Sequence, residues 1–130
     1  HDFTYSLYPH GGDWRNGAVQ EGAELNMPLL AVPVKAAKGA LPDVYALASV
    51  DADNVVIDTV KKAEDSDALI VRLYEAHGQR GEVTLTFGQP VKSVTECDLM
   101  EENDVPIKHD EDSVGFFITP YEIRTFRVEF

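Results

Sequence analysis

Short runs of residues that alternate between apolar and polar side chains recur along most of the chain. In the run Leu69–Glu75, one face would carry Leu69, Val71 and Leu73, and the opposite face the residues between them. A period of two is typical of a strand with one buried face, because successive side chains of a strand point to opposite sides of the sheet. The pattern therefore restricts the chain to sheets whose two faces differ in polarity.

These runs have the length and spacing of strands in a sandwich. We expect strands at Phe3–Tyr8, Leu29–Val34, Val44–Val50, Asn54–Lys61, Ala68–Ala76, Glu82–Phe87, Val91–Leu99, Gly115–Ile118 and Glu122–Phe130. Polar or glycine-containing stretches separate several of them and suit hairpins. Many short strands without alternating helices predict an antiparallel β-sandwich. At 130 residues, a single domain over residues 1–130 is expected.

One short helix is expected near the N-terminus, from residue 14 to about residue 26. Asp13 is a suitable N-cap, and Pro28 would end the helix. Gly17 and Gly22 oppose it, since each costs about 1 kcal/mol relative to alanine inside a helix. The predicted fold class is therefore all-β, an antiparallel β-sandwich with one short helix near the N-terminus.

The chain is strongly acidic, with 11 Lys and Arg against 23 Asp and Glu and a formal net charge of −12. Binding to DNA, RNA or anionic lipid depends on basic side chains, so we expect neither nucleic acid nor membrane as a partner. No run approaches the roughly 18 apolar residues of a transmembrane helix.

The origin of the chain is indicated by few features. Cys97 is the single cysteine and cannot form an internal disulfide; its place among alternating apolar residues predicts a buried, unreactive thiol. No Asn-x-Ser/Thr site occurs. These features suit a cytoplasmic location or a bacterial origin. Because the chain begins at His1 with no Met and no signal segment, we expect a fragment or a processed product.

The sequence lacks the common motifs of catalytic and metal sites. The four histidines show no zinc-ligand spacing, and neither the G-x-S-x-G pattern nor a phosphate-binding loop occurs. Eight acids lie between Glu96 and Asp112, but without the register of a calcium loop. We therefore expect a solvated, mobile acidic loop between Leu99 and Ser113. A carboxylate pair for glycoside hydrolysis stays open, since spacing in sequence does not determine spacing in the fold.

Three segments resemble class II α-mannosidases of glycoside hydrolase family 38. They are the opening His1-x-Phe3-x-Tyr5-x-Leu7-x-Pro9-His10 with Gly12-Asp13-Trp14, the stretch Val60-Lys61-Lys62-Ala63-Glu64 running to Arg72-Leu73-Tyr74-Glu75, and the closing Pro120-x-Glu122-Ile123-x-Thr125. The last two resemble parts of the C-terminal β-domain of these enzymes. Together they cover most of the chain in the expected order.

The resemblance implies a noncatalytic piece of a retaining α-mannosidase that hydrolyses α-linked mannosides. In that family, the zinc site and the catalytic carboxylates lie in an N-terminal α/β domain, so no residue here receives a catalytic or metal role. No cofactor is expected in this fragment, and zinc is expected in the missing catalytic domain. The implied partners are the catalytic domain of the same parent chain and mannoside glycans.

The resemblance also implies roles for particular side chains. His10, Asp13 and Trp14 would line the contact with the catalytic domain or the rim of the substrate cleft. In the alternative interpretation, Trp14 opens the helix and packs on its own sandwich. In a purely structural interpretation of the same segments, the sandwich core contains Phe3, Tyr5, Leu7, Leu73 and Tyr74. Arg72 and Glu75 would then form an edge or inter-strand ion pair.

Two other function classes remain. One is a self-contained carbohydrate-binding or interaction module, in which exposed aromatic side chains stack on sugar rings; Tyr8, Trp14 and Tyr121 are the candidates. The other is a small acidic hydrolase. Glycan binding by the isolated chain would favour the first, and turnover of an aryl α-mannoside the second.

Overall fold

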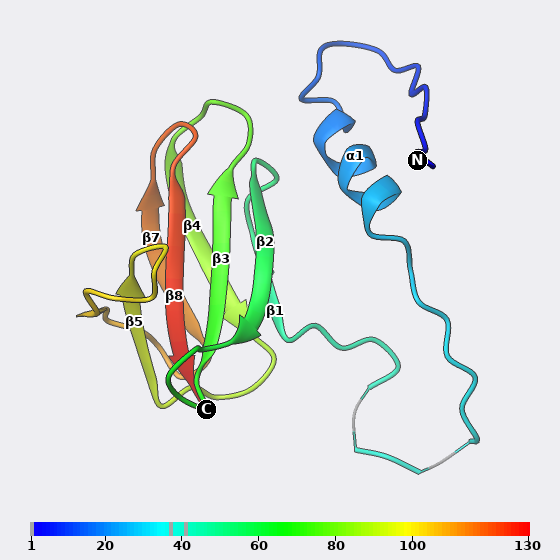
Figure 1. Cartoon of the computed structure of the whole chain (residues 1–130). Coiled ribbons are helices and arrows are strands. Elements are labelled where there is room, and N and C mark those ends of the chain that lie inside the picture. The colour runs from blue at the N-terminus through cyan, green and yellow to red at the C-terminus, as the bar shows by residue number, and fades with distance from the viewer. Residues whose placement is uncertain (1, 37, 41) are drawn as a thin grey trace. The chain divides into compact units, whose positions relative to one another are not determined.

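The computed structural model describes residues 2–36, 38–40 and 42–130. The chain divides into two units, His1–Ala40 and Leu41–Phe130, which are described separately (Figure 1). Within the described part of the chain, no helix is long and apolar enough to cross a membrane.

The first unit contains the expected helix, but the helix is shorter than predicted. Helix α1 spans Ala18–Asn26, and its N-cap is Gly17 rather than Asp13. Gly17 adopts φ +95°, outside the helical region, so the helix can begin only after it. A Cβ at residue 17 would also lie 2.9 Å from the Tyr8 hydroxyl. Asp13 instead closes the turn before the helix, where its carbonyl accepts a hydrogen bond from the Asn16 amide at 2.9 Å.

The strands predicted at Phe3–Tyr8 and Leu29–Val34 are wrong. Both segments lack a strand assignment, and their side chains are exposed, with Phe3 at 83%. Phe3, Tyr5 and Leu7 are therefore not part of the core that the sequence predicted. The physical reason is that alternating apolar and polar side chains make a segment compatible with a sheet, but a strand forms only where a neighbouring strand pairs with its backbone.

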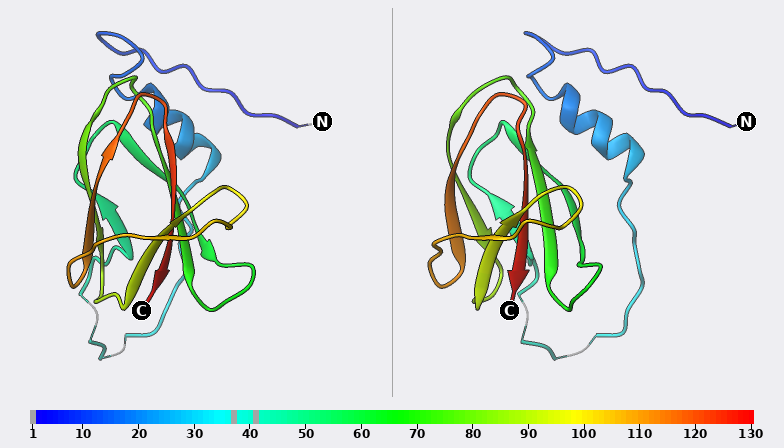
Figure 2. Two further views of the ribbon diagram at one scale, coloured as in Figure 1. Left: turned by 90° about the vertical axis from the view of Figure 1, so that its left-hand side faces the viewer. Right: turned by 60° about the vertical axis from the view of Figure 1, so that its left-hand side comes forward.

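The second unit is the predicted antiparallel sandwich, and the all-β fold class is confirmed. One sheet has the order β1-β4-β7 and the other the order β2-β3-β8-β5-β6, with all pairs antiparallel. The strands are β1 Ala48–Val50, β2 Val55–Lys62, β3 Leu69–Glu75, β4 Gly81–Phe87, β5 Ser93–Cys97, β6 Val105–Pro106, β7 Ser113–Ile118 and β8 Ile123–Glu129. Figures 1 and 2 show the two sheets facing each other.

Two differences from the predicted strands have local causes. β1 begins at Ala48 instead of Val44, because only Ala48–Val50 pairs with β4. The short strand β6 was not predicted, since it lies in the acidic run and contains Pro106. Proline has no amide to donate, and it is accepted here because β6 is an edge strand.

The core lies between the sheets and follows the predicted alternation. Val71 and Leu73 of β3 meet side chains from both sheets, including Leu85, Val114 and Phe126. A smaller cluster on the other face of the larger sheet joins Ile70, Cys97 and two alanines, Ala63 and Ala68. β3 therefore buries residues on both faces. Leu73 lies in the core as predicted, but Tyr74 does not: it is half-buried and lies on the face of β3 opposite to Leu73.

Candidate functional site

A buried carboxylate joins three loops at one end of the sandwich. Glu75 ends β3 and is 1% exposed. Its Oε1 accepts hydrogen bonds from Asn54 Nδ2 at 2.9 Å and from the His77 amide at 2.8 Å. Its Oε2 accepts hydrogen bonds from the Gly78 amide at 2.8 Å and the Tyr121 amide at 2.9 Å. Glu75 thus connects the β1–β2, β3–β4 and β7–β8 loops.

The electrostatics of Glu75 agree with a part in holding these loops together. Burial by itself would raise the pKa of this carboxyl, but the hydrogen bonds from Tyr121, Asn54 and the β3–β4 loop outweigh it and hold the pKa at about 2. The carboxylate is ionised at neutral pH, and both of its oxygens already accept two hydrogen bonds. The predicted ion pair with Arg72 is wrong: Arg72 donates to Thr125 Oγ1 and to the Leu99 carbonyl.

Tyr121 and Gly78 meet where two of these loops come together. Both residues have positive φ, +59° for Tyr121 and +72° for Gly78. The positive φ favours glycine at residue 78, and a Cβ there would lie 2.7 Å from the Tyr121 hydroxyl and displace it. The Tyr121 side chain nevertheless stays 63% exposed. The result is an exposed aromatic side chain on a well-supported loop end.

The closing motif of the chain explains how the β7–β8 loop turns. The Glu122 carboxylate accepts hydrogen bonds from the amide and the hydroxyl of Thr119, both at 2.7 Å. The Glu122 carbonyl accepts a hydrogen bond from the Glu75 amide at 2.9 Å, which leads directly into the β3–β8 pairing. Thr125 is buried and accepts the hydrogen bond from Arg72. Glu122 and Thr125 of the motif therefore stabilise the turn and the strand after it.

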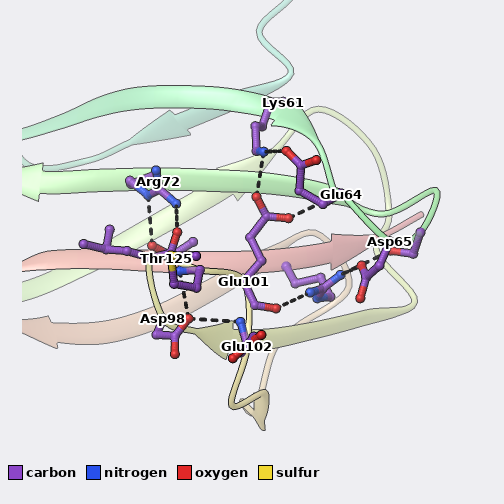
Figure 3. Close-up of polar contacts among 12 residues, drawn as sticks. Lys61, Glu64, Asp65, Arg72, Asp98, Glu101, Glu102 and Thr125 are labelled. Carbon is purple, nitrogen blue, oxygen red and sulfur yellow. Dashed lines mark hydrogen bonds and ion pairs between the residues drawn. The ribbon is translucent and has the colours of Figure 1, made fainter.

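A second polar cluster holds residues 98–104, the loop after β5, on the outer face of the larger sheet. Arg127 of β8 donates to the Glu101 carbonyl at 2.6 Å and to Asp65 at 2.6 Å, and it pairs with Asp104 at 3.2 Å. The Glu101 carboxylate pairs with Lys61 at 2.7 Å and accepts a hydrogen bond from the amide of Glu64. Figure 3 shows Lys61 on β2, Glu64 and Asp65 in the β2–β3 turn, and Glu101 in the loop after β5.

This cluster corrects the prediction of a solvated acidic loop. Glu101 is 8% exposed, and Lys61 beside it lowers the pKa of its carboxyl. Asp98 folds the loop by accepting hydrogen bonds from the amides of Met100 and Glu102 and from Asn103 Nδ2. Part of the acidic run is thus anchored, and Cys97 at its start is buried as predicted. Burial raises the pKa of the Cys97 thiol.

The residues predicted for docking lie in the first unit. Asp13 and Trp14 are joined through Arg15, whose Nη1 lies 2.6 Å from the Asp13 carboxylate and whose guanidinium lies 4.7 Å from the centre of the Trp14 ring. His10 stacks on Tyr8, with 5.1 Å between ring centres. Trp14 is 40% exposed, and the His10 and Asp13 side chains are exposed as well.

Sequence reasoning missed both polar clusters. Glu75 and Arg127 are charged residues in strands with buried neighbours, which is the signal that could have marked them, since a buried charge needs partners. Of the aromatic candidates, Tyr121 belongs to the second unit, and Tyr8 and Trp14 to the first. Among the residues that the structure describes, no group of three or more His, Cys, Asp or Glu could hold a metal ion.

Comparisons with known proteins agree with the sandwich. The sequence model of the glycosyl hydrolases family 38 C-terminal beta sandwich domain matches residues 54–126. Alpha-mannosidase 2C1 of Mus musculus is 37% identical over an alignment of 133 positions, which covers 96% of this chain and 12% of the mouse protein. The Homo sapiens alpha-mannosidase 2C1 is 41% identical over 108 residues, 80% of this chain and 10% of the human protein.

A more distant organism supports the same assignment. Alpha-mannosidase G of Dictyostelium discoideum is 36% identical over an alignment of 135 positions, which covers 98% of this chain and 12% of that protein. The chain thus spans between a tenth and an eighth of the length of these relatives. The family match begins just before β2 and runs into β8, so it covers most of the sandwich. The chain belongs to glycosyl hydrolase family 38, of which it carries the C-terminal β-sandwich domain.

Proposed function

We propose that this chain is a noncatalytic part of a retaining α-mannosidase that hydrolyses α-linked mannosides. The observation that carries the proposal is the family match over the sandwich, together with relatives named as α-mannosidases. The structure adds that the most deeply buried carboxylate, Glu75, has both oxygens engaged by loop donors. Its chemistry suits positioning of loops rather than proton transfer to a substrate.

The role of the sandwich in the parent enzyme is to support the catalytic domain and to border the substrate cleft. The partner is the catalytic domain of the same polypeptide, to which we also assign the zinc ion. We assign no described residue of this chain as a ligand of that ion. Exposed aromatic and polar side chains at His10, Asp13 and Trp14 support their place in the contact or at the cleft rim. We also propose a cytoplasmic location, supported by the single cysteine and the lack of an Asn-x-Ser/Thr site.

An activity assay of the pure 130-residue chain tests the proposal. With an aryl α-mannoside, we expect no turnover above the buffer rate, either with or without added zinc. A preparation of Glu122→Gln serves as a control for contaminating activity, because a contaminant is unaffected by the substitution. Turnover that a single carboxylate substitution in this chain abolishes would show that the chain is itself a hydrolase.

A further inference from the structure

We propose that Tyr121, together with the loop of Gly78, Gln79 and Arg80, forms a binding subsite for one pyranose ring of a glycan. The Tyr121 side chain is 63% exposed and lies where the β3–β4 and β7–β8 loops meet. The choice of an α-mannoside as the sugar rests on the proposed function. The subsite itself rests on the geometry of this loop end.

Tyr121 follows Pro120 in the turn that is closed by the hydrogen bond from the Glu122 amide to the Thr119 carbonyl, 3.1 Å long, and its backbone has a conformation that is rare for a bulky residue. Its φ of +59° lies in the left-handed region, where a bulky residue is rare and where glycine or asparagine is favoured. Such conformations persist where the surrounding structure imposes them, and they gather at binding sites. Here the hydrogen bond from the Tyr121 amide to Glu75, 2.9 Å long, holds the strained residue in place. The sandwich thus keeps an aromatic ring at a position where glycine would be less strained.

The Tyr121 ring is also held from the opposite loop. The ring and hydroxyl lie so close to Gly78 that a Cβ there would come within 3.0 Å of the ring carbon Cζ. Because the Tyr121 amide and the amides of His77 and Gly78 bind the same buried carboxylate, the backbone that carries the ring and the loop beside it are fixed together. A rigid aromatic side chain loses little conformational freedom when it binds a ligand, which favours binding.

The chemistry around the ring suits a sugar better than a protein partner. A pyranose presents a C–H face that packs on an aromatic ring and hydroxyl groups around its edge that need polar partners. Gln79 and Arg80 follow Gly78 in the loop, and both side chains are exposed. They can supply donors for sugar hydroxyls. Ile123, which is 51% exposed, is the neighbour that would suit an apolar protein surface instead.

Nuclear magnetic resonance titration of the 130-residue chain with α-linked mannobiose tests this proposal. We expect the amide signals of Gly78 and Tyr121 to shift, with a dissociation constant of about 1 mM, as for a single weak subsite. Tyr121→Gly removes the ring but keeps the amide that donates to Glu75, and it suits the positive φ. We expect this variant to bind at least about ten-fold more weakly without any loss of thermal stability. Phe117→Ala, which removes another exposed aromatic side chain from the same unit, should bind as the unmodified chain does.

Three outcomes would change the conclusion. The absence of shifts at about 20 mM mannobiose, far above the expected dissociation constant, would overturn the subsite and leave Tyr121 and Ile123 as a surface for protein contact. Binding that Tyr121→Gly retains would overturn it as well. Equal binding of cellobiose and mannobiose would keep the pyranose subsite and remove only its link to α-mannosides. The proposed function is tested separately, by the turnover assay.

Discussion

Arg124 and Glu96 form an ion pair on the core side of the larger sheet, where Arg124 Nη2 donates to Glu96 Oε2 at 2.7 Å. Arg124 lies opposite Leu73 and Glu96 opposite Phe126 in the strand register, so both side chains face the other sheet. Arg124 Nη1 also donates to the Phe117 carbonyl of β7, at 2.9 Å. The guanidinium therefore links β8 and β5 of the larger sheet to β7 of the smaller sheet.

Glu96→Ala should destabilise the sandwich more than the loss of an ordinary ion pair. The substitution leaves Arg124, whose side chain is 16% exposed, with only the longer ion pair to Glu122 at 3.7 Å, and we expect a loss of about 2 kcal/mol in the free energy of unfolding. Urea denaturation measures it. The matched control is Lys62→Ala, because the Lys62–Asp67 pair is of similar length but almost entirely exposed. Equal small effects of the two substitutions would show that the Arg124 pair does not contribute to stability.

Glu75 should make the stability of the sandwich depend on pH in acid. Its pKa is lowered from 4.5 to about 2, so folding favours the ionised carboxylate. The stabilisation is complete above pH 4.5, decreases as the pH falls from 4.5 to 2, and amounts to about 3 kcal/mol. Urea denaturation at a series of pH values measures the dependence. In Glu75→Gln this part of the pH dependence should be absent, and the variant should be less stable at pH 7, because an amide cannot accept from all four donors. A parallel pH profile for the two proteins would contradict the assignment.

Arg127 should control the accessibility of Cys97. Arg127 holds the loop that follows Cys97 through the Glu101 carbonyl and Asp104. Arg127→Met keeps much of the side-chain volume but removes these contacts, so local opening of the loop should become easier. We expect the labelling rate of Cys97 by a thiol reagent under native conditions to increase about ten-fold or more. Lys62→Met is the control and should leave the rate unchanged. A rate for Arg127→Met within two-fold of the unmodified chain would mean that the loop does not protect Cys97.

Trp14 should behave as a surface residue of the isolated chain. Its side chain is 40% exposed and contacts the Arg15 guanidinium. As the single tryptophan, it reports on this position alone. We expect red-shifted fluorescence, ready quenching by acrylamide, and a loss of less than about 1 kcal/mol on Trp14→Ala. Blue-shifted, quench-resistant emission with a loss above about 3 kcal/mol would make Trp14 a core residue and remove it from the docking surface.

Local patterning by itself determined most strands of the sandwich, with β6 and the start of β1 as the exceptions. Leu69–Glu75 and its neighbours alternate with a period of two, and that period depends only on strand geometry, so it can be read without knowledge of the partners. The buried position of Cys97 follows from the same alternation. The segment Phe3–Tyr8 shows the limit of this reasoning. It has the pattern of a strand, but its side chains are exposed, because pairing depends on a neighbour that the pattern does not specify.

Only the tertiary structure decided what the charged residues do. Glu75 and Tyr121 lie 46 positions apart, and their hydrogen bond exists because the β3–β8 pairing brings two loops to one end of the sheet. Asp65 and Arg127, 62 positions apart, meet for a similar reason. Hydrogen bonds and ion pairs act over a few ångströms, and each requires a particular orientation of both groups. An acidic sequence offers many equivalent partners, so the identity of the partners is set by the register of the strands and the path of the loops.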